Sequence, residues 1–285
     1  MKKIILLILF AGILLSSFKS NEEKLLSKTI RDSYQYIPSG YTIKEGKKIH
    51  VQAFYMMSTE VSNLNYKEFL AFLERNQLSQ KQEIAKTRED GWNDEVFQKT
   101  YFRHPAYDDY PVVNITKKAA QLYCDWLEET LNHSGHIKEG YQVVDCRLPT
   151  SQEWIVAAQS GHPSAIYPWG GFYTRNAKGC VLANYNQIGE EQITFDTSSG
   201  QYRVIENAER PAHAIAPAPV KSFWPNDFGL YNMSGNIAEM VFDKDVVLGG
   251  SWHSTGYDIR IQSEMPFNNY SPQVGFRPVF QIVKK

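Results

Sequence analysis

The stretch Asp227-Phe-Gly-Leu-Tyr-Asn-Met-Ser-Gly-Asn-Ile-Ala-Glu239 decides the fold of this chain. It is rich in Gly, Asn and Ser, which are residues of turns and loops rather than of helix or strand interiors. From Tyr167 onward the sequence keeps this character, with Gly, Pro, Asn, Ser and aromatic residues in place of regular periodicity. Such backbone must satisfy its own amide groups, through Asn and Asp side chains or a metal ion. The sequence therefore predicts long, ordered loops over its second half.

The composition is that of an ordinary globular protein. Hydrophobic residues make up 42% of the 285 residues and charged residues 21%, and no repeat or low-complexity linker divides the chain. The formal net charge of -1 excludes the basic surface that nucleic-acid binding requires. We expect a single mixed α+β domain, with low regular secondary structure and long ordered loops.

The N-terminus has the pattern of a targeting segment. Lys2 and Lys3 precede an apolar run, Ile4–Leu15, which small and polar residues follow. This predicts a secretory signal peptide over residues 1–20 and export to the periplasm or cell surface, with an uncleaved N-terminal anchor as the alternative. Cleavage would also remove Lys19, which gives a mature net charge of -1 - 3 = -4 and leaves no membrane span. No cysteine stands near the end of the run, so we expect no lipidation.

Several elements can be predicted ahead of the loops. Residues 21–35 are predicted to form a polar leader, mobile or helical on the surface, and residues 36–285 the domain. Alternation over residues 50–57 predicts a strand. The side chains expected to cap three helices are Ser62, Thr116 and Thr150, the last in a capping box with Glu153.

Further motifs surround the opening stretch, and together they resemble one family. They are Phe54-Tyr-Met-Met-Ser-Thr-Glu-Val-Ser-Asn63, Tyr66-Lys-Glu-Phe69, Tyr110-Pro-Val-Val-Asn114, Tyr123-Cys-Asp-Trp126, Cys146-Arg-Leu-Pro-Thr150, Glu153-Trp154, Tyr167-Pro-Trp-Gly170, Ala183-Asn184, Gly249-Gly-Ser-Trp252 and Gly275-Phe-Arg277. In this order, across residues 36–283, they resemble the formylglycine-generating enzyme or sulfatase-modifying factor family. The resemblance implies that family's fold, whose best-known enzymes oxidise a cysteine with copper and a cysteine pair of their own.

One segment is similar to a particular branch of this family. The sequence Tyr101-Phe-Arg-His-Pro-Ala-Tyr-Asp-Asp-Tyr-Pro-Val-Val113 resembles the gliding-motility and type IX secretion branch. Proteins of that branch are periplasmic components associated with the outer membrane and are usually lipoproteins, whereas this chain lacks the acylation cysteine. The resemblance implies a role in the cell envelope, with an envelope protein or peptide as the partner.

The redox cysteines of the family are missing from this chain. In the family the first of them lies two residues after the Trp of the Gly-Gly-Ser-Trp turn, where this chain has Ser254. The cysteines present are Cys124, Cys146 and Cys180. Because Cu(I) is bound by soft thiolates, we expect neither copper nor formylglycine generation. We favour buried thiols at Cys124 and Cys146, and a single disulfide among the three cysteines is the alternative.

His253 is the alternative site for metal chemistry, because it directly follows the turn. His213 and His104 are its candidate companions, although their spacing matches no pattern of metal ligands. A lone histidine is more often a packing residue that forms hydrogen bonds. A metal-dependent oxidoreductase with a non-cysteine site is therefore the second hypothesis of function.

The resemblance also implies a structural Ca²⁺ site in the stretch of residues 227–239. Its ligands in the family correspond to the side chains of Asn232 and Glu239 and to the carbonyl groups of Gly235 and Ile237. Hard oxygen donors on a loop that contains glycine are what Ca²⁺ requires. The alternative interpretation is that Asn232 and Asn236 bond only the backbone of their own loop.

Two further groups of side chains are open to interpretation. The first is a set of arginines that we expect to pair with carboxylates inside the fold: Arg147, Arg260 and Arg277. The second is a set of aromatic residues that we interpret as packing under the loops, with a recognition groove for a peptide or glycan as the alternative: Tyr257, Phe267, Tyr270 and Phe276.

The sequence thus supports two hypotheses. The first is a non-catalytic binding or scaffold protein of the cell envelope, a pseudoenzyme connected with gliding or type IX secretion. The second is the oxidoreductase with a site around His253. An oxidase must present convergent metal ligands or a titratable pair in a groove. A scaffold should instead present an apolar or charged patch that suits a partner.

Overall fold

The computed structural model describes residues 23–92, 94–187, 193–204, 216–267 and 269–285, so the predicted signal peptide lies outside the described residues. The short 3-10 helices are η1 (Glu23–Leu25), η2 (Arg31–Ser33) and η3 (Pro105–Tyr107). The α-helices are α2 (Asn63–Arg75), α3 (Ser79–Ala85), α4 (Glu95–Thr100), α5 (Lys117–His133) and α6 (Ser151–Gln159). The strands are β1 (Tyr34–Ile37), β2 (Gly40–Lys44), β3 (Lys47–Val51), β4 (Phe54–Met57), β5 (Tyr141–Arg147), β6 (Ile193–Asp196), β7 (Gln201–Val204), β8 (Ala238–Met240), β9 (Val246–Leu248), β10 (Met265–Pro266), β11 (Val274–Gly275) and β12 (Val279–Lys284).

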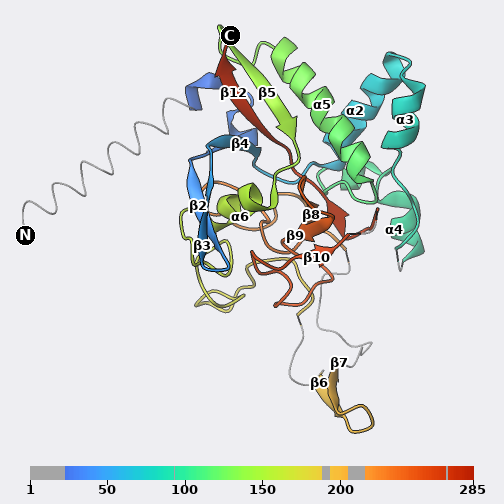
Figure 1. Ribbon diagram of the computed structural model, residues 1–285. Helices are drawn as coiled ribbons and strands as arrows, with labels where there is room; N and C mark the ends of the chain where they lie inside the picture. Colours follow the sequence, from blue (N-terminus) through green and yellow to red (C-terminus); the bar gives the residue numbers. More distant parts are fainter. Residues whose placement is uncertain (1–22, 93, 188–192, 205–215, 268) are drawn as a thin grey trace, which may run out of the picture.

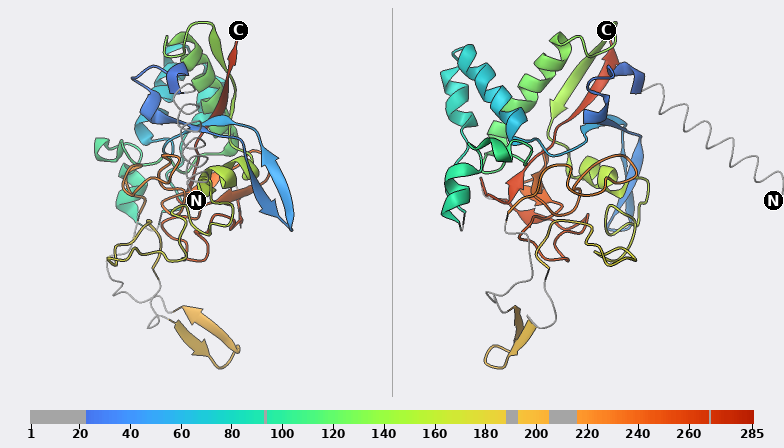
Figure 2. Two further views of the ribbon diagram at one scale, coloured as in Figure 1. Left: turned by 90° about the vertical axis from the view of Figure 1, so that its left-hand side faces the viewer. Right: turned by 180° about the vertical axis from the view of Figure 1, so that it is seen from behind.

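The first sheet is antiparallel, in the order β1-β4-β12-β5, and it has a hydrophobic cluster on each face. Because successive side chains of a strand point to opposite faces, β4 serves both clusters. Tyr55 and Met57 pack with α2 and α5, whereas Phe54 and Met56 pack with α6. Figures 1 and 2 show α2, α3 and α5 on one flank of this sheet and α6 with the β2–β3 hairpin on the other.

The second sheet consists of very short strands, in the order β10-β9-β8-β11. Its pair β8–β11 is parallel and the other two pairs are antiparallel. Figure 1 shows β8, β9 and β10 close together between the first sheet and the long loops. Met240 packs into the cluster under α5 and Leu248 into the cluster under α6, so this small sheet holds the loops of the second half against both cores.

The predicted helix starts are confirmed. Ser62 caps α2 by accepting a hydrogen bond from the Asn65 amide, and Thr116 caps α5 in the same manner. Thr150 and Glu153 form the expected capping box of α6. Glu153 also accepts two hydrogen bonds from the Arg147 guanidinium, at 2.8 and 2.9 Å, which confirms that predicted ion pair.

The predicted leader requires a correction. In its described part Leu25 and Leu26 are buried, and Leu26 forms a β-bridge with Ile137. Charged residues flank these two leucines in the sequence, yet Leu26 packs into the hydrophobic cluster under α5. The domain therefore includes residues well before position 36. Among the described residues, no helix is both apolar and long enough to cross a bilayer.

The strand predicted over residues 50–57 is also wrong as a single element. β3 ends at Val51 and β4 begins at Phe54. β3 pairs with β2 in a hairpin, whereas β4 pairs with β1 and β12 in the first sheet. The chain passes from one sheet to another between them, and a period-2 pattern carries no signal of such a change.

The capping box gives a first testable prediction. We expect Thr150→Ala to lower the free energy of unfolding by about 1 kcal/mol, because the Glu153 amide loses its acceptor. Urea unfolding at neutral pH measures the change. Thr130→Ala is the control, since Thr130 is exposed within α5, and it should change stability by less than about 0.5 kcal/mol. Equal effects of the two substitutions would contradict the cap.

Candidate functional site

A buried ion pair lies at the C-terminal end of the stretch of residues 227–239. Arg277 donates from Nε and Nη2 to the carboxylate of Glu239 at 2.7 to 2.9 Å, which confirms a second predicted arginine pair. Its Nη atoms also donate to main-chain carbonyls at the end of β4 and at Tyr231. The indole of Trp154 donates to Glu239 Oε2 at 2.8 Å. Burial alone would lower the pKa of Arg277, but the Glu239 carboxylate holds that pKa above its usual value.

A second buried carboxylate, Glu60, is held by asparagines of the same stretch. Asn232 Nδ2 donates to Glu60 Oε2 at 3.1 Å, and Asn236 Nδ2 donates to Oε1 at 2.8 Å. Asn236 Oδ1 in turn accepts from Asn184 Nδ2 at 3.1 Å. Burial raises the pKa of Glu60 to about 7, although the positive charge of Arg277 opposes this rise.

Sequence reasoning missed Glu60 as part of this network. The one local signal is a glutamate three residues after the end of β4, in a segment whose residues are all buried. Its partners, Asn232 and Asn236, lie 172 and 176 residues further along the chain. The interpretation that these asparagines bond only their own loop is therefore wrong, because both of them hold a distant carboxylate.

The oxygen atoms predicted to bind Ca²⁺ differ in whether they already accept hydrogen bonds. Asn232 Oδ1 is buried and has no hydrogen-bond partner, and such an orphaned acceptor suits a cation. No main-chain amide of the described loops donates to the carbonyl groups of Gly235 and Ile237. Glu239, however, already directs both carboxylate oxygens at Arg277. The donor set thus offers neutral oxygens without a free negative charge, which fits a weak site, and the Ca²⁺ ion stays a prediction.

Ser254, at the predicted position of the family's first redox cysteine, is held within its own turn. Ser254 Oγ accepts from the Ser251 amide at 3.0 Å and lies 3.2 Å from Ser251 Oγ. The same hydroxyl points at Met265 Sδ, at 3.8 Å. Ser254 and Ser251 are both buried. The arrangement supplies hydroxyl groups where copper chemistry would need thiolates.

The three thiols of the chain are elsewhere. All are free; Cys124 and Cys146 are buried, as expected, and Cys180 is exposed. Cys124 on α5 and Cys146 on β5 belong to the same hydrophobic cluster. Burial raises the pKa of the Cys146 thiol well above its usual value, and the neighbouring Cys124 adds to the rise. Cys146 therefore remains a protonated core thiol rather than a thiolate ligand.

The histidines proposed as metal ligands have different surroundings. His253 is exposed, and its ring meets the Trp252 ring edge-on at 5.4 Å. His104 Nδ1 accepts from the Ala106 amide at 3.1 Å and so caps η3, while His213 lies outside the described residues. In the described part of the chain, no three His, Cys, Asp or Glu side chains gather as a group that would hold a metal ion.

Arg260 does not pair with a carboxylate, which corrects the third arginine prediction. Its guanidinium stacks over the ring of Tyr257, 4.2 Å from the centroid. Its Nε is buried and has no hydrogen-bond partner. The acidic residues closest to it along the chain are already engaged, because Asp258 accepts from its own turn and Glu264 pairs with Lys244. Arg260 therefore keeps a charge that no described side chain neutralises.

The predicted aromatic cluster is not one group. Phe276 is buried in the cluster under α5, and Phe267 packs against that cluster from its edge. The ring of Tyr270 lies under the guanidinium of Arg88, whereas Tyr257 is exposed beside Arg260. Packing is the correct interpretation for Phe276 and Phe267, and the four rings do not form a common groove.

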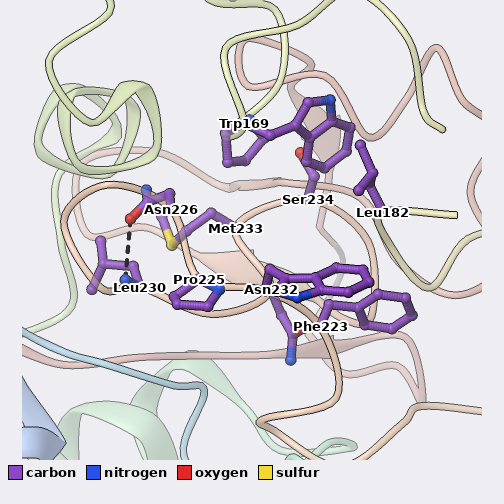
Figure 3. Close-up of a pocket in the computed structure, with 11 residues that line it drawn as sticks. Trp169, Leu182, Phe223, Pro225, Asn226, Leu230, Asn232, Met233 and Ser234 are labelled. Atoms are coloured by element: carbon purple, nitrogen blue, oxygen red, sulfur yellow. Dashed lines mark hydrogen bonds between the residues drawn. The ribbon is translucent and has the colours of Figure 1, made fainter. Parts of the chain in front are cut away.

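A pocket with aromatic and apolar walls lies next to the Asn232 network. Figure 3 shows Trp169 and Leu182 on one side of it and Phe223 and Pro225 on the other. Asn232 lines this pocket, and its Nδ2 donates hydrogen bonds to Glu60 and to a main-chain carbonyl. The volume is about 50 Å³, which is room for a small group only. None of its lining side chains is titratable, so the pocket provides contact area rather than acid–base groups.

Glu60 predicts a pH dependence of stability. Its carboxyl has a pKa of about 7 in the folded state against 4.5 for an unperturbed glutamate, so only the unfolded chain releases the proton between these values. The stabilisation of the folded state by protonated Glu60 is fully present below about pH 4.5. It is lost as the pH rises to about 7, which lowers the free energy of unfolding by roughly 3 kcal/mol. We expect Glu60→Gln to flatten that part of the stability curve, measured by urea unfolding with EDTA present. Glu129→Gln, at an exposed position in α5, should keep the wild-type slope, and a wild-type slope in Glu60→Gln would contradict the assignment.

Comparison with known proteins gives several similar sequences. An inactive C-alpha-formylglycine-generating enzyme 2 of Bos taurus is 28% identical over 156 residues, which are 52% of this chain and 40% of that protein. The formylglycine-generating enzyme of Thermomonospora curvata is 29% identical over 150 residues, 52% of this chain and 37% of that protein. The formylglycine-generating enzyme of Mus musculus is 24% identical over 255 residues, 80% of this chain and 56% of that protein. The matched region thus spans roughly two fifths to slightly more than half of these relatives.

Solved structures and a family model agree on the fold. The crystal structure of CarF matches with a TM-score of 0.54 at 20% identity, and the match covers 86% of this chain and 97% of that one. PvdO from Pseudomonas aeruginosa matches with a TM-score of 0.54 at 17% identity, covering 87% and 94%. The family model of the sulfatase-modifying factor enzyme 1-like domain matches residues 29–282. This chain therefore belongs to the sulfatase-modifying factor family and has the fold of the formylglycine-generating enzymes.

Proposed function

We propose that this chain is an exported, non-catalytic binding or scaffold protein of the cell envelope. The observation that carries the proposal is the buried hydroxyl of Ser254, at the position where the resemblance predicts the first thiolate of the family's oxidases. A hydroxyl does not replace a thiolate as a ligand of Cu(I). One of the similar proteins carries the word inactive in its name, which supports a family with non-catalytic members.

A contact surface beside the pocket of Figure 3 supports the binding role. Trp224, Phe172 and Tyr173 are exposed by 66%, 72% and 79%, and Trp224 lines the pocket. Trp169 Nε1 donates to the Tyr173 carbonyl at 2.8 Å and so joins the Phe172–Tyr173 segment to the pocket wall. Exposed aromatic side chains grouped in this way are typical of surfaces that contact a partner. An envelope protein or peptide of the gliding or type IX secretion machinery is the partner we propose.

The second candidate function is a metal-dependent oxidoreductase at His253. What favours it is an exposed imidazole, next to the Gly-Gly-Ser-Trp turn, whose ring nitrogens form no hydrogen bond to a described residue. A catalytic metal normally has three protein ligands. Since the described residues bring no such trio together, the binding role has the stronger support.

Metal content and oxygen uptake separate the two functions. In protein purified from its native host we expect neither copper nor iron in stoichiometric amount, by elemental mass spectrometry, and no oxygen consumption with a cysteine-containing peptide. The formylglycine-generating enzyme of Thermomonospora curvata serves as the positive control. His253→Ala should leave both measurements unchanged, as should His133→Ala at an exposed position of α5. The scaffold proposal would be contradicted if the wild-type protein contained stoichiometric copper or iron and consumed oxygen, and if His253→Ala lost both the metal and the oxygen uptake.

The place of the protein in the cell is tested separately. Fractionation of the native host, with an antibody against the domain, should find the protein in the envelope fraction after removal of an N-terminal segment. A pool confined to the cytoplasm would contradict the envelope role while leaving the non-catalytic assignment unaffected.

A further inference from the structure

We propose that a pocket around Arg260 binds a small ligand that carries a carboxylate on an apolar body. The pocket has a volume of about 300 Å³ and is lined by residues of two segments, 163–166 and 257–263. It shares no lining residue with the pocket of Figure 3. It uses neither Ser254 nor His253, so the inference stands whether or not the turn is catalytic.

The two segments form a preorganised frame. The Ile261 amide donates to the Ile166 carbonyl at 3.0 Å and links them directly. Within the second segment, Ser263 donates from its hydroxyl to the Tyr257 carbonyl at 2.9 Å and from its amide to the Arg260 carbonyl at 3.0 Å. These bonds hold the backbone that carries Arg260 before any ligand arrives, which limits the entropy lost on binding.

The guanidinium of Arg260 is the reason to expect an anion. It is the one charged side chain in the lining of this pocket, and it donates no hydrogen bond to the described residues. A buried or half-buried guanidinium is normally paired, as Arg147 and Arg277 are in this chain. Since no described side chain balances the charge of Arg260, an anion in the pocket would supply the missing partner.

The contact with Tyr257 decides which kind of anion fits. The Tyr257 ring covers one face of the guanidinium, at 4.2 Å, so the edge of the guanidinium is what remains for a ligand. Because Arg260 Nε is itself shielded, the ligand would meet the Nη groups. A planar carboxylate can accept two parallel hydrogen bonds from such an edge. The stack on Tyr257 would hold the guanidinium in the matching orientation.

The remaining lining residues define the rest of the ligand. Pro163, Ala165 and Ile166 supply an apolar wall, and Ser164 and Gln262 are exposed polar side chains without hydrogen bonds to the described residues. A volume of about 300 Å³ lies at the lower end of the range of small-molecule pockets. The lining therefore suits a small organic acid with one apolar side rather than a free inorganic ion.

Binding of benzoate tests the proposal on the full-length mature protein. Benzoate has a carboxylate on an apolar ring, and benzamide is its neutral isostere of nearly the same shape. By saturation-transfer NMR titration we expect saturable benzoate binding in the millimolar range, because so small a ligand offers few contacts. Benzamide and inorganic phosphate should bind at least about tenfold more weakly.

Substitutions assign the binding to Arg260. Arg260→Gln should weaken benzoate binding about tenfold or more, and Arg260→Lys should weaken it less, because a lysine keeps the charge and loses the planar fork. Arg203→Gln is the matched control, since Arg203 is exposed in the β6–β7 hairpin and should leave the affinity unchanged. If Arg260→Gln does not fold, the benzoate affinity of Arg260→Lys alone tests the assignment to Arg260. Equal affinities for benzoate and benzamide, wild-type affinity in a folded Arg260 variant, or binding of phosphate alone would overturn the proposal.

Discussion

The buried pair of Glu239 and Arg277 is the interaction on which the rest of the structure depends. The guanidinium has no solvent exposure and the carboxylate almost none, so each needs the other. Through the same guanidinium the pair joins the end of β4, the carbonyl of Tyr231 and strand β8. Loss of one partner would leave a buried charge without compensation, at a cost of about 3–5 kcal/mol. Both sheets are therefore fastened at one point in the interior.

Around that point the loops are held by asparagine side chains instead of regular secondary structure. Asn236 reaches Glu60, Asn184 and a main-chain amide, so one side chain bonds three separate segments. Gly235 makes the close approach of these segments possible, because a Cβ at its position would lie 2.4 Å from the Asn184 carbonyl oxygen. Its positive φ of 74° is also one that glycine adopts without strain. The irregular half of the molecule is thus determined by specific polar contacts.

The part of this structure that the sequence predicts is the part determined locally. The caps at Ser62, Thr116 and Thr150 depend on residues within one turn, and all three were predictable. The family motifs predicted the fold because the resemblance implies contacts between distant segments. Local sequence patterns alone do not predict such contacts. Glu60 and Arg260 could not be assigned in this way. Whether a carboxylate or a guanidinium finds a partner depends on which distant residues fold against it, and Arg260 found none among the described residues.

The contacts that hold the fold are also separate from the chemistry of the family's oxidation. Neither Glu239, Arg277 nor Asn236 needs a thiol or a copper ion for its hydrogen bonds. The turn at Ser254 is stabilised by its own hydroxyl contacts, so it forms without a thiol at this position. The hydrogen bonds that hold the architecture are therefore independent of the chemistry at the turn. A fold of this kind specifies where a site can form, whereas the residues at the site decide what it does.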